Sequence, residues 1–288
     1  MTDVYDEHRS LLFTVAYEML GSTAEAEDVL QESWLRWAEV DQEEVHDPRA
    51  YLVRVVTRQC LNRLRALKRQ RESYVGPWLP EPLVTAPDVA DDVELADAVS
   101  FAMLLVLETL QPLERAVFLL HEVFGFGYDE IAVATDKTTA AVRQLAHRAR
   151  QHVAERRPRV AVDHASHANA LEQFLVAAVT GDVQSLMNLL SPQVVLLTDG
   201  GGTARAALRP IIGADKVVRW MQGVLATVDN VVVDRRIVNG APALLVLVDG
   251  TVDLVAGIRP QDGRIAEIYL VRSPDKVAAV SRSHVVSR

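Results

Sequence analysis

Three basic side chains recur at helical spacing in the segment GYDEIAVATDKTTAAVRQLAHRARQHV, residues 127–153. Arg143, His147 and Arg150 are three to four residues apart, so a helix places them on one face, with almost no acid nearby. Another face of this helix is apolar and consists of Val142, Leu145, Ala149 and Val153. Basic groups in this arrangement can bind nucleic-acid phosphates. The competing interpretation is a solvated surface helix, which the same pattern also fits.

The residues around this helix predict a helix-turn-helix. A first helix with Ile131 and Ala132 facing inward breaks at residues 134–137. The second helix starts near Thr138 and Thr139, whose hydroxyls can cap free backbone N–H groups.

A second basic segment runs from Tyr51 to Arg71 and contains no acidic residue. Its basic residues are Arg54, Arg58, Arg63, Arg65, Lys68, Arg69 and Arg71. This one-sidedness weakens the interpretation as a solvated face. We expect a nucleic acid as the partner, because clustered positive charge attracts a polyanion.

The sequence contains few residues or motifs that indicate an enzyme or a metal site. The chain has no G-x-S-x-G elbow, HExxH or Walker motif. Gly200–Gly202 lack the following G-K-S/T of a phosphate loop and favour a tight turn, and His164 with His167 favours a helix start over a metal pair. The single Cys60 excludes an intrachain disulfide and a cysteine-cluster metal site. We expect a protein that is not an enzyme and has no cofactor and no metal.

Length and composition indicate several domains. A chain of 288 residues with 49% hydrophobic residues is long for one core, so two or three domains are expected. The net charge of −9 argues against a free-standing, non-specific DNA binder. No apolar run approaches the roughly 20 residues that span a bilayer, and the N-terminus lacks the apolar region of a signal peptide. We expect a cytoplasmic protein with no membrane partner.

The N-terminal pattern predicts three helices between residues 7 and 70. An apolar stripe ends at Gly21, and a capping box at residues 22–25 starts the next helix. That helix places Leu30, Trp34 and Trp37 inward, and its acidic and amide face consists of Asp28, Gln31 and Glu32. The basic helix begins at residues 47–48, where an N-cap aspartate precedes a proline.

Residues 72–95 read as an extended, partly flexible linker, because four prolines and a cluster of aspartates lie within GPWLPEPLVTAPDVADDVE. Helical periodicity resumes at Val93 and continues to Leu110. A further helix opens at Gln111, and its apolar residues should pack beneath the helix-turn-helix.

The remainder of the chain predicts an α+β domain. Two helices at 164–180 and 182–190 precede short strands, and the helix 214–225 interrupts these strands. The predicted strands are 194–197, 231–238, 243–248, 251–258 and 264–271. Turns at Asn239-Gly240, Asp249-Gly250 and Asp262-Gly263 are strong hairpin signals. We expect a curved antiparallel sheet wrapped around helices, with an internal pocket.

Three segments resemble a bacterial RNA polymerase sigma factor of the extracytoplasmic-function type: AEAEDVLQESWLRW, DPRAYLVRVVTRQCLNRLRALKRQR and LQPLERAVFLLHEVFGFGYDEIAVATDKTTAAVRQLAHRAR. The last domain resembles a SnoaL-like domain of the NTF2-like fold. The motifs of the subgroup with this extra domain are present as WLPEP at 78–82, DGGG at 199–202 and SPDKV at 273–277. The chain departs from the subgroup's pattern at Asn62, Thr203 and Ser273.

The resemblance implies two all-α sigma domains and an α+β SnoaL-like domain. Sigma region 2 would span residues 1–72, a linker 73–95, sigma region 4 residues 96–160 and the SnoaL-like regulatory domain 161–288. The partners would be promoter DNA and core RNA polymerase, through its β′ clamp and β flap. An unidentified small ligand is a candidate occupant of the SnoaL-like pocket.

The resemblance also assigns roles to residues. The polymerase would be bound by Asp28, Gln31 and Glu32. The −10 promoter element would be bound by Arg54, Arg58, Asn62, Arg63, Arg65, Lys68 and Arg69. The −35 element would be bound by Thr138, Thr139, Arg143, Gln144, His147, Arg148 and Arg150, with Arg143 and Arg148 best placed to contact guanine in the major groove.

A contact between the linker and the third domain would regulate activity without a separate anti-sigma protein. We expect the loop Asp199–Gly202 to cover the ring of Trp78 and to offer free N–H groups to Glu81. The regulatory residues would be Trp78, Pro80, Glu81, Asp199, Gly200, Gly201, Gly202, Asp275 and Lys276. The alternative function is a ligand-sensing or catalytic SnoaL-like protein fused to a conventional operator-binding module.

Overall fold

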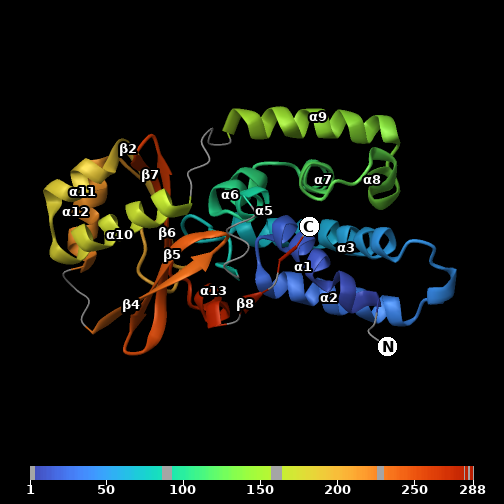
Figure 1. Ribbon diagram of the computed structural model, residues 1–288, viewed down its shortest axis with the longest axis horizontal. Helices are drawn as coiled ribbons and strands as arrows, with labels where there is room; N and C mark the ends of the chain where they lie inside the picture. The colour runs from blue at the N-terminus through green and yellow to red at the C-terminus, as the bar shows by residue number, and fades with distance from the viewer. Residues whose placement is uncertain are drawn as a thin grey trace.

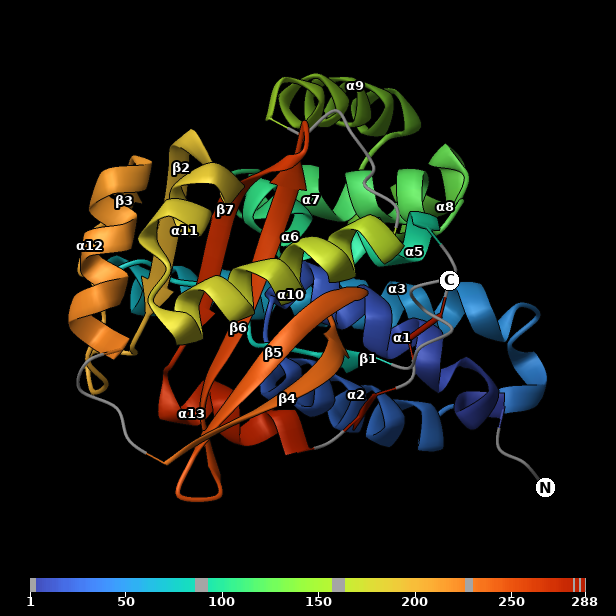
Figure 2. The same cartoon turned by 60° about the vertical axis from the view of Figure 1, so that its left-hand side comes forward.

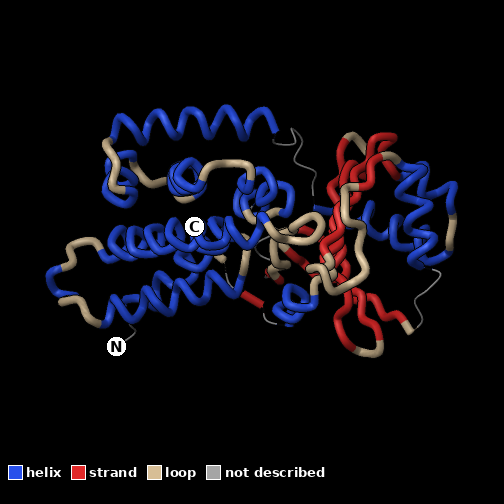
Figure 3. The backbone as a smooth tube through the Cα atoms, turned by 180° about the vertical axis from the view of Figure 1, so that it is seen from behind, coloured by secondary structure: helices blue, strands red, loops and turns tan. Residues whose placement is uncertain are grey.

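The computed structural model describes residues 4–85, 93–156, 164–225, 230–281, 283–284 and 286–287. One half of the molecule is helical and the other half contains a β-sheet, as Figure 1 and the view from behind in Figure 3 show. The acidic part of the predicted linker, residues 86–92, lies outside the described residues.

The first domain consists of α1 (Val4–Leu20), α2 (Thr23–Ala38), the short η1 (Gln42–Glu44) and α3 (Pro48–Glu72). Ser22 caps α2 by accepting a hydrogen bond from Glu25 N at 3.2 Å, as the capping-box pattern predicts. Every residue from Leu11 to Leu20 is buried. A helix covered on all sides must contact several neighbours, and α1 packs against α2, α3 and the second domain.

The expected inward position of Trp34 is wrong. Its side chain is 44% exposed, whereas Trp37 is 1% exposed and packs against the Tyr51 ring at 5.7 Å between centroids. Trp34 therefore lies on the surface of α2, beside the predicted polymerase-binding face.

The second domain contains α5 (Val93–Ala98), α6 (Phe101–Glu108), α7 (Pro112–Phe118), η2 (Leu119–Val123), α8 (Tyr128–Thr135) and α9 (Thr139–Arg156). The predicted break between α8 and α9 is confirmed, because Asp136 adopts a left-handed conformation with φ 56°. Thr138 Oγ1 then accepts a hydrogen bond from Ala141 N at 3.2 Å and caps α9.

The third domain contains α10 (His164–Thr180), α11 (Val183–Leu189), β2 (Leu190–Asp199), β3 (Ile211–Ile212), α12 (Ala214–Leu225), β4 (Val231–Val238), β5 (Ala241–Val248), β6 (Thr251–Gln261), β7 (Arg264–Val271), α13 (Pro274–Val277), η3 (Ala278–Ser281) and β8 (Ser283–His284). Helices α10, α11 and α12 cover one face of the sheet, as Figure 2 shows. The α+β class is confirmed.

The sheet has the order β3-β2-β7-β6-β5-β4-β1-β8. Strands β4 to β7 form the predicted antiparallel meander. The curved sheet is mainly antiparallel, as expected, and in addition β2 pairs with β7 in parallel. The chain leaves β2, passes through α12 and the meander, and returns beside β2, and a connection of this length allows parallel neighbours.

The linker is packed more tightly than its composition suggests. Leu79 is 0% exposed and Leu83 is 1% exposed, and the strand β1 (Val84–Thr85) joins the sheet between β4 and β8. The C-terminal segment then returns to the first domain, where Ser287 N donates to Thr14 Oγ1 at 3.0 Å. Figure 3 shows the C-terminus against the helical half. Residues next to a proline favour extended backbone, so the end of the linker can pair as a strand.

Candidate polymerase and promoter interfaces

Asp28, Gln31 and Glu32 are all exposed on α2. Their spacing places them on one face of the helix. Asp28 also forms an ion pair with Arg63 of α3, with 2.7 Å between Oδ2 and Nη2. Arg63 pairs in addition with Glu25 of α2. The predicted polymerase-binding face therefore adjoins the basic helix.

The basic helix α3 is less one-sided in space than in sequence. Arg63 is paired with acids of α2, and Arg71 is paired with Glu108 of α6. Arg65 is exposed and donates to the exposed Asn62 at 2.8 Å. The side chains of Lys68 and Arg69 lie outside the described residues. Acids supplied by neighbouring helices thus neutralise part of the predicted promoter-binding surface.

Arg58 of α3 binds the first helix of the helix-turn-helix. Its Nε donates to Ala134 O at 3.2 Å and its Nη2 donates to Val133 O at 3.1 Å. These carbonyls belong to the last turn of α8, where a helix has free acceptors and a partial negative charge. Arg49 supports the contact, because its guanidinium lies 4.4 Å from the centroid of the Phe126 ring. A residue predicted to bind the −10 element is therefore engaged by the second domain.

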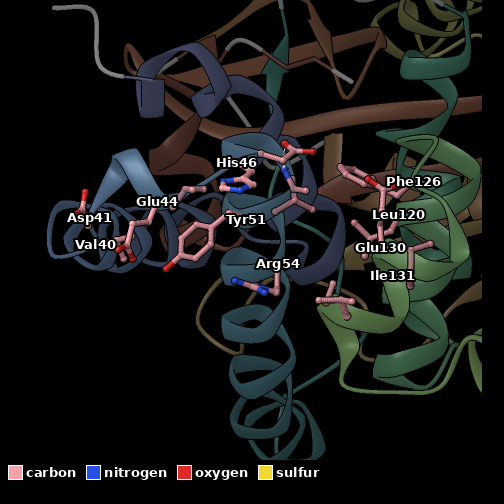
Figure 4. Close-up of a pocket in the computed structure, with 16 residues that line it drawn as sticks. Val40, Asp41, Glu44, His46, Tyr51, Arg54, Leu120, Phe126, Glu130 and Ile131 are labelled. Carbon is pink, nitrogen blue, oxygen red and sulfur yellow. Dashed lines mark hydrogen bonds between the residues drawn. The ribbon is translucent and has the colours of Figure 1, made fainter.

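A groove of about 600 Å³ lies beside this contact. Residues 40–54 of the first domain line one side, and residues 120–134 of the second domain line the other. In Figure 4, Tyr51 and Arg54 lie on the side of the first domain, and Phe126, Glu130 and Ile131 lie on the other side. The Arg54 guanidinium lies 5.0 Å from the Tyr51 ring centroid. The two helical domains thus meet along α3 and α8 and leave a groove open at their border.

Helix α9 carries the residues predicted for the −35 element. Its buried stripe is the predicted one, Val142, Leu145, Ala149 and Val153. Its exposed residues include Arg143, Gln144, His147, Arg148 and Arg150. Thr138 is exposed and caps the helix, and Thr139 donates to Asp129 at 2.6 Å.

The expectation of almost no acid near this basic face is wrong. Arg148 Nη2 lies 3.3 Å from Glu114 of α7, and Arg150 Nε lies 3.6 Å from Glu122 of η2. Arg143 lies 5.7 Å from the Tyr128 ring centroid. The acids come from helices that pack beneath α9, so the sequence of α9 alone could not reveal them.

Asp199 is fully buried at the junction of the linker and the third domain. Its Oδ2 accepts hydrogen bonds from Leu79 N at 2.8 Å and Lys276 Nζ at 2.7 Å. Its Oδ1 accepts from Tyr74 OH at 2.6 Å and Gly201 N at 3.0 Å. Lys276 also donates to Leu79 O at 2.6 Å. The structure therefore brings the DGGG and SPDKV motifs together on the linker.

The ring of Trp78 has a different cover from the one expected. Lys276 Nζ lies 4.3 Å and the Arg71 guanidinium 3.9 Å from its centroid. A Cβ added to Gly201 would instead meet Ser273, and one added to Gly202 would meet Val75. Two cations, which the face of an aromatic ring attracts, lie over the ring in place of the expected glycine loop. Pro80 is buried, and Asp275 is exposed.

Glu81 caps helix α2 and does not contact the glycine loop. One carboxylate oxygen accepts from Ser22 Oγ at 2.7 Å. The other accepts from Thr23 N at 2.7 Å, from Thr23 Oγ1 at 2.7 Å and from Ala24 N at 3.3 Å. The expected partner was wrong because a helix N-terminus offers several free N–H groups and a partial positive charge. The linker thus stabilises the helix that carries the predicted polymerase-binding face.

Two further arginines join the helical domains, and the sequence analysis missed their role. Arg115 of α7 is 3% exposed and donates to Met19 O at 2.7 Å. Arg71 donates to Leu20 O at 2.7 Å. Both satisfy carbonyls at the C-terminus of α1, and Glu108 pairs with both guanidinium groups. A local sequence pattern cannot predict these contacts, because Met19, the partner of Arg115, lies 96 residues away in the chain.

The helix-covered face of the sheet in the third domain is an apolar core, formed by residues such as Phe174, Val217 and Ile268. Burial lowers the pKa of His167 on α10 to about 4, so this side chain is neutral at pH 7. No cluster of three potential metal ligands occurs among the described residues. Among all residues that the structure describes, no helix is long and apolar enough to cross a membrane.

Two helical domains, one of them with a helix-turn-helix, define the scaffold of a sigma factor. Family models for Sigma-70 region 2 and Sigma-70, region 4 match residues 4–70 and 100–153. The chain belongs to the extracytoplasmic-function (ECF) RNA polymerase sigma factors. It is 36% identical over 286 residues to the ECF RNA polymerase sigma factor SigJ of Mycobacterium tuberculosis, covering 94% of this chain and 91% of SigJ.

Two other comparisons agree. The probable ECF RNA polymerase sigma factor SigI of M. tuberculosis is 33% identical over 270 residues, with 93% of this chain and 91% of SigI covered. The crystal structure of M. tuberculosis SigJ matches with a TM-score of 0.76 at 32% identity and covers 96% of this chain and 98% of that one. The likeness therefore extends over all three domains.

Proposed function

We propose that this chain binds core RNA polymerase through α2 and directs it to promoters through α3 and α9, under the control of its own third domain. The observation that carries the proposal is that one sigma-factor scaffold has two exposed surfaces of opposite character. Helix α2 exposes an acidic and amide face, and helix α9 exposes basic residues. Asp28, Gln31 and Glu32 would bind basic residues of the β′ clamp, and the second domain would contact the β flap.

The promoter contacts follow from basic residues that are exposed or, in the case of Arg54, partly exposed. Arg54, Arg58 and Arg65 of α3 would bind the −10 element and help to hold an extruded base, at a cost of a few kcal/mol that the contacts must offset. Arg143 and Arg148 of α9 would read the −35 element, where an arginine can contact guanine with two hydrogen bonds.

The two helical domains are in contact in this structure, an arrangement that we call closed. We propose that binding to polymerase separates them. Elements named −10 and −35 are centred about 25 base pairs apart, which is about 85 Å along B-form DNA at 3.4 Å per base pair. Helices α3 and α8 are in direct contact, and Arg58 donates to α8. The two helical domains therefore cannot bind their elements on one duplex at the same time until this contact is broken. A third domain that holds the closed form would act in place of a separate anti-sigma protein.

The competing function is an operator-binding regulator with a sensing or catalytic third domain. Such a regulator would gain little from the exposed face of Asp28, Gln31 and Glu32, whereas a sigma factor needs a polymerase-binding surface.

Run-off transcription with core polymerase on a random-promoter library tests the proposal. We expect transcripts that share −10 and −35 sequences and that depend on the chain. A control with reversed charges at Asp28 and Glu32 should lose this activity and retain its fold. A folded chain that binds DNA but yields no transcript with core enzyme would overturn the proposal in favour of the operator-binding regulator.

A further inference from the structure

The hairpin turn Asn239-Gly240, between β4 and β5, inserts into the junction of the three domains. Its backbone is the same as in the other two hairpin turns: φ is 53° and 68° here, 50° and 80° at Asp249-Gly250, and 51° and 72° at Asp262-Gly263. The surroundings differ. Asn239 is 0% exposed, whereas Asp249 and Asp262 are exposed. The two exposed turns therefore serve as references for a hairpin turn of this backbone that makes no contact at the junction.

The Asn239 side chain contacts both helical domains and the linker. Its Nδ2 donates to Tyr17 OH of α1 at 2.6 Å and to Val99 O, between α5 and α6, at 2.8 Å. Its Oδ1 accepts from Leu83 N of the linker at 3.1 Å. The backbone adds a bond from Asn239 N to Leu83 O at 2.8 Å and one from Gly240 N to Thr85 Oγ1 at 3.2 Å.

An amide is required at this position, since the side chain donates two hydrogen bonds and accepts one. A carboxylate offers acceptors only, and the exposed turns show that Asp fits the same backbone. Tyr17 in turn donates to Glu81 O at 2.7 Å, and the Glu81 carboxylate caps α2. Burial raises the pKa of Tyr17, so the hydroxyl keeps the proton that it donates. The turn is thus linked by hydrogen bonds to the predicted polymerase-binding helix.

Gly240 is needed for a second reason. A Cβ on this residue would lie 2.6 Å from Ala96 Cα and 2.9 Å from Ala96 Cβ of α5. A Cβ on Gly250 or Gly263 would meet nothing within 4 Å. The close approach of two backbones therefore adds to the requirement for a left-handed conformation, which all three glycines share.

We infer that Asn239 is a positioning residue that holds both promoter-binding domains in the closed arrangement, separately from the contact of Asp199 with Lys276. The two contacts lie at different strands of the third domain: Asn239 directly follows β4, and Asp199 ends β2. The inference specifies how the proposed sigma factor is regulated, and for its effect on transcription it rests on that proposed function. The effect of Asn239 on the arrangement of the domains in the free chain does not depend on that proposed function.

The test measures the distance between spin labels at Glu39→Cys after α2 and Glu155→Cys near the end of α9, in the full chain. We expect one narrow distance distribution in the parent and in the control Asp249→Asn. Asn239→Asp should add a second, separate distance population, with a closed-to-open ratio lowered about 5- to 150-fold, the range of typical coupling between sites. Gly240→Ala should do the same and its control Gly250→Ala should not.

Tyr17→Phe removes the acceptor for Asn239 without adding charge and serves if Asn239→Asp fails to fold. An unchanged distance distribution in folded Asn239→Asp and Tyr17→Phe would overturn the inference, even if the melting temperature falls, because that result shows a merely structural role. Transcription is measured in parallel. If the parent chain gives no transcript while the distances shift as expected, the proposed function fails and the positioning role of Asn239 stands.

Discussion

Arg63 Nη2 of α3 lies 2.7 Å from Asp28 Oδ2 of α2, so one ion pair joins the predicted promoter-binding helix to the predicted polymerase-binding face. Asp28 is more than half exposed and Arg63 is about one-third exposed. An exposed pair of this kind contributes at most about 1 kcal/mol to stability. Polymerase could therefore exchange this internal pair for a basic residue of its own clamp at low cost, and Arg63 would then keep only its pair with Glu25.

The first prediction concerns polymerase binding. Asp28→Lys with Glu32→Lys should weaken binding to core polymerase by tenfold or more, a loss of about 1.4 kcal/mol or more, because repulsion replaces attraction. Fluorescence anisotropy of a labelled chain titrated with core enzyme measures this. Glu27→Lys is the control, since Glu27 lies on α2 outside the predicted face and pairs with Arg9. Unchanged affinity of a folded double variant would remove this face from the proposal.

A second prediction concerns readout of the −35 element. Arg143→Ala or Arg148→Ala should cost about 1 to 3 kcal/mol and relax sequence preference at one position if the side chain contacts a base. A phosphate contact would instead weaken binding evenly across sequences and lower the salt slope by about one. Binding titrations on matched and mismatched duplexes at several salt concentrations separate these outcomes. If neither variant has an effect at any salt concentration, α9 does not read the promoter.

The third prediction uses the acid that faces Arg148. Glu114→Gln removes the charge 3.3 Å from Arg148 Nη2 but keeps a side chain that can complete the capping box of α7. Affinity for any duplex should rise severalfold and the salt dependence should steepen, because a paired cation becomes available to DNA. Glu155→Gln, next to Arg156 near the end of α9, is the matched control. Equal affinities in the two variants would contradict the prediction.

The sequence predicted local features well and long-range partners poorly, for a physical reason. The boundaries of α10, α12, β4 and β7 and the three hairpin turns agree with the structure, because helical periodicity and Asn-Gly or Asp-Gly pairs act within a few residues. The buried and exposed faces of α9 were also predictable. Pairings across the fold were not.

Glu81 and Asn239 illustrate the limit. Glu81 binds Thr23, 58 residues away, and Asn239 binds Tyr17, 222 residues away. Both are ordinary polar residues in a linker and a turn, and their roles arise only when three domains pack together. The motifs containing Asp199 and Lys276 were singled out by resemblance, but the position of Lys276 over Trp78 was not foreseen.

A fourth prediction concerns the buried pair of Asp199 and Lys276, whose side chains are 0% and 9% exposed. Asp199→Ala leaves the ammonium group without its counter-ion and should lower the free energy of unfolding by about 3 to 5 kcal/mol. Adding Lys276→Met should recover part of this loss, since no buried charge then remains unpaired.

Denaturant unfolding measures both variants. Asp253→Ala is the control, because its pair with Arg272 is about one-third exposed and its loss should cost about 1 kcal/mol or less. A double variant as unstable as the sum of its single variants would show that the two side chains do not act together. The same cycle with Trp78→Ala tests whether the ring is coupled to Asp199 through Lys276.

The last prediction concerns Glu18 of α1, which is 1% exposed and has no hydrogen-bond partner for either carboxylate oxygen among the described residues. Burial, with a smaller effect of Asp97, raises the pKa of this carboxyl from 4.5 to about 8. The folded chain thus binds the proton more tightly than the unfolded chain does. The contribution to stability is fully present below pH 4.5 and declines until about pH 8, by at most about 1.4 kcal/mol per pH unit.

Glu18→Gln keeps the shape of the side chain but does not titrate. Relative to the parent, its free energy of unfolding should therefore increase steadily between pH 5 and pH 8, as measured by denaturant unfolding at intervals of one unit. Glu27→Gln is the control, because Glu27 is more than one-third exposed and paired with Arg9, and its difference from the parent should vary little over this range. Parallel pH profiles for the parent and Glu18→Gln would mean that Glu18 is ionised in the folded chain or has no role in its pH dependence.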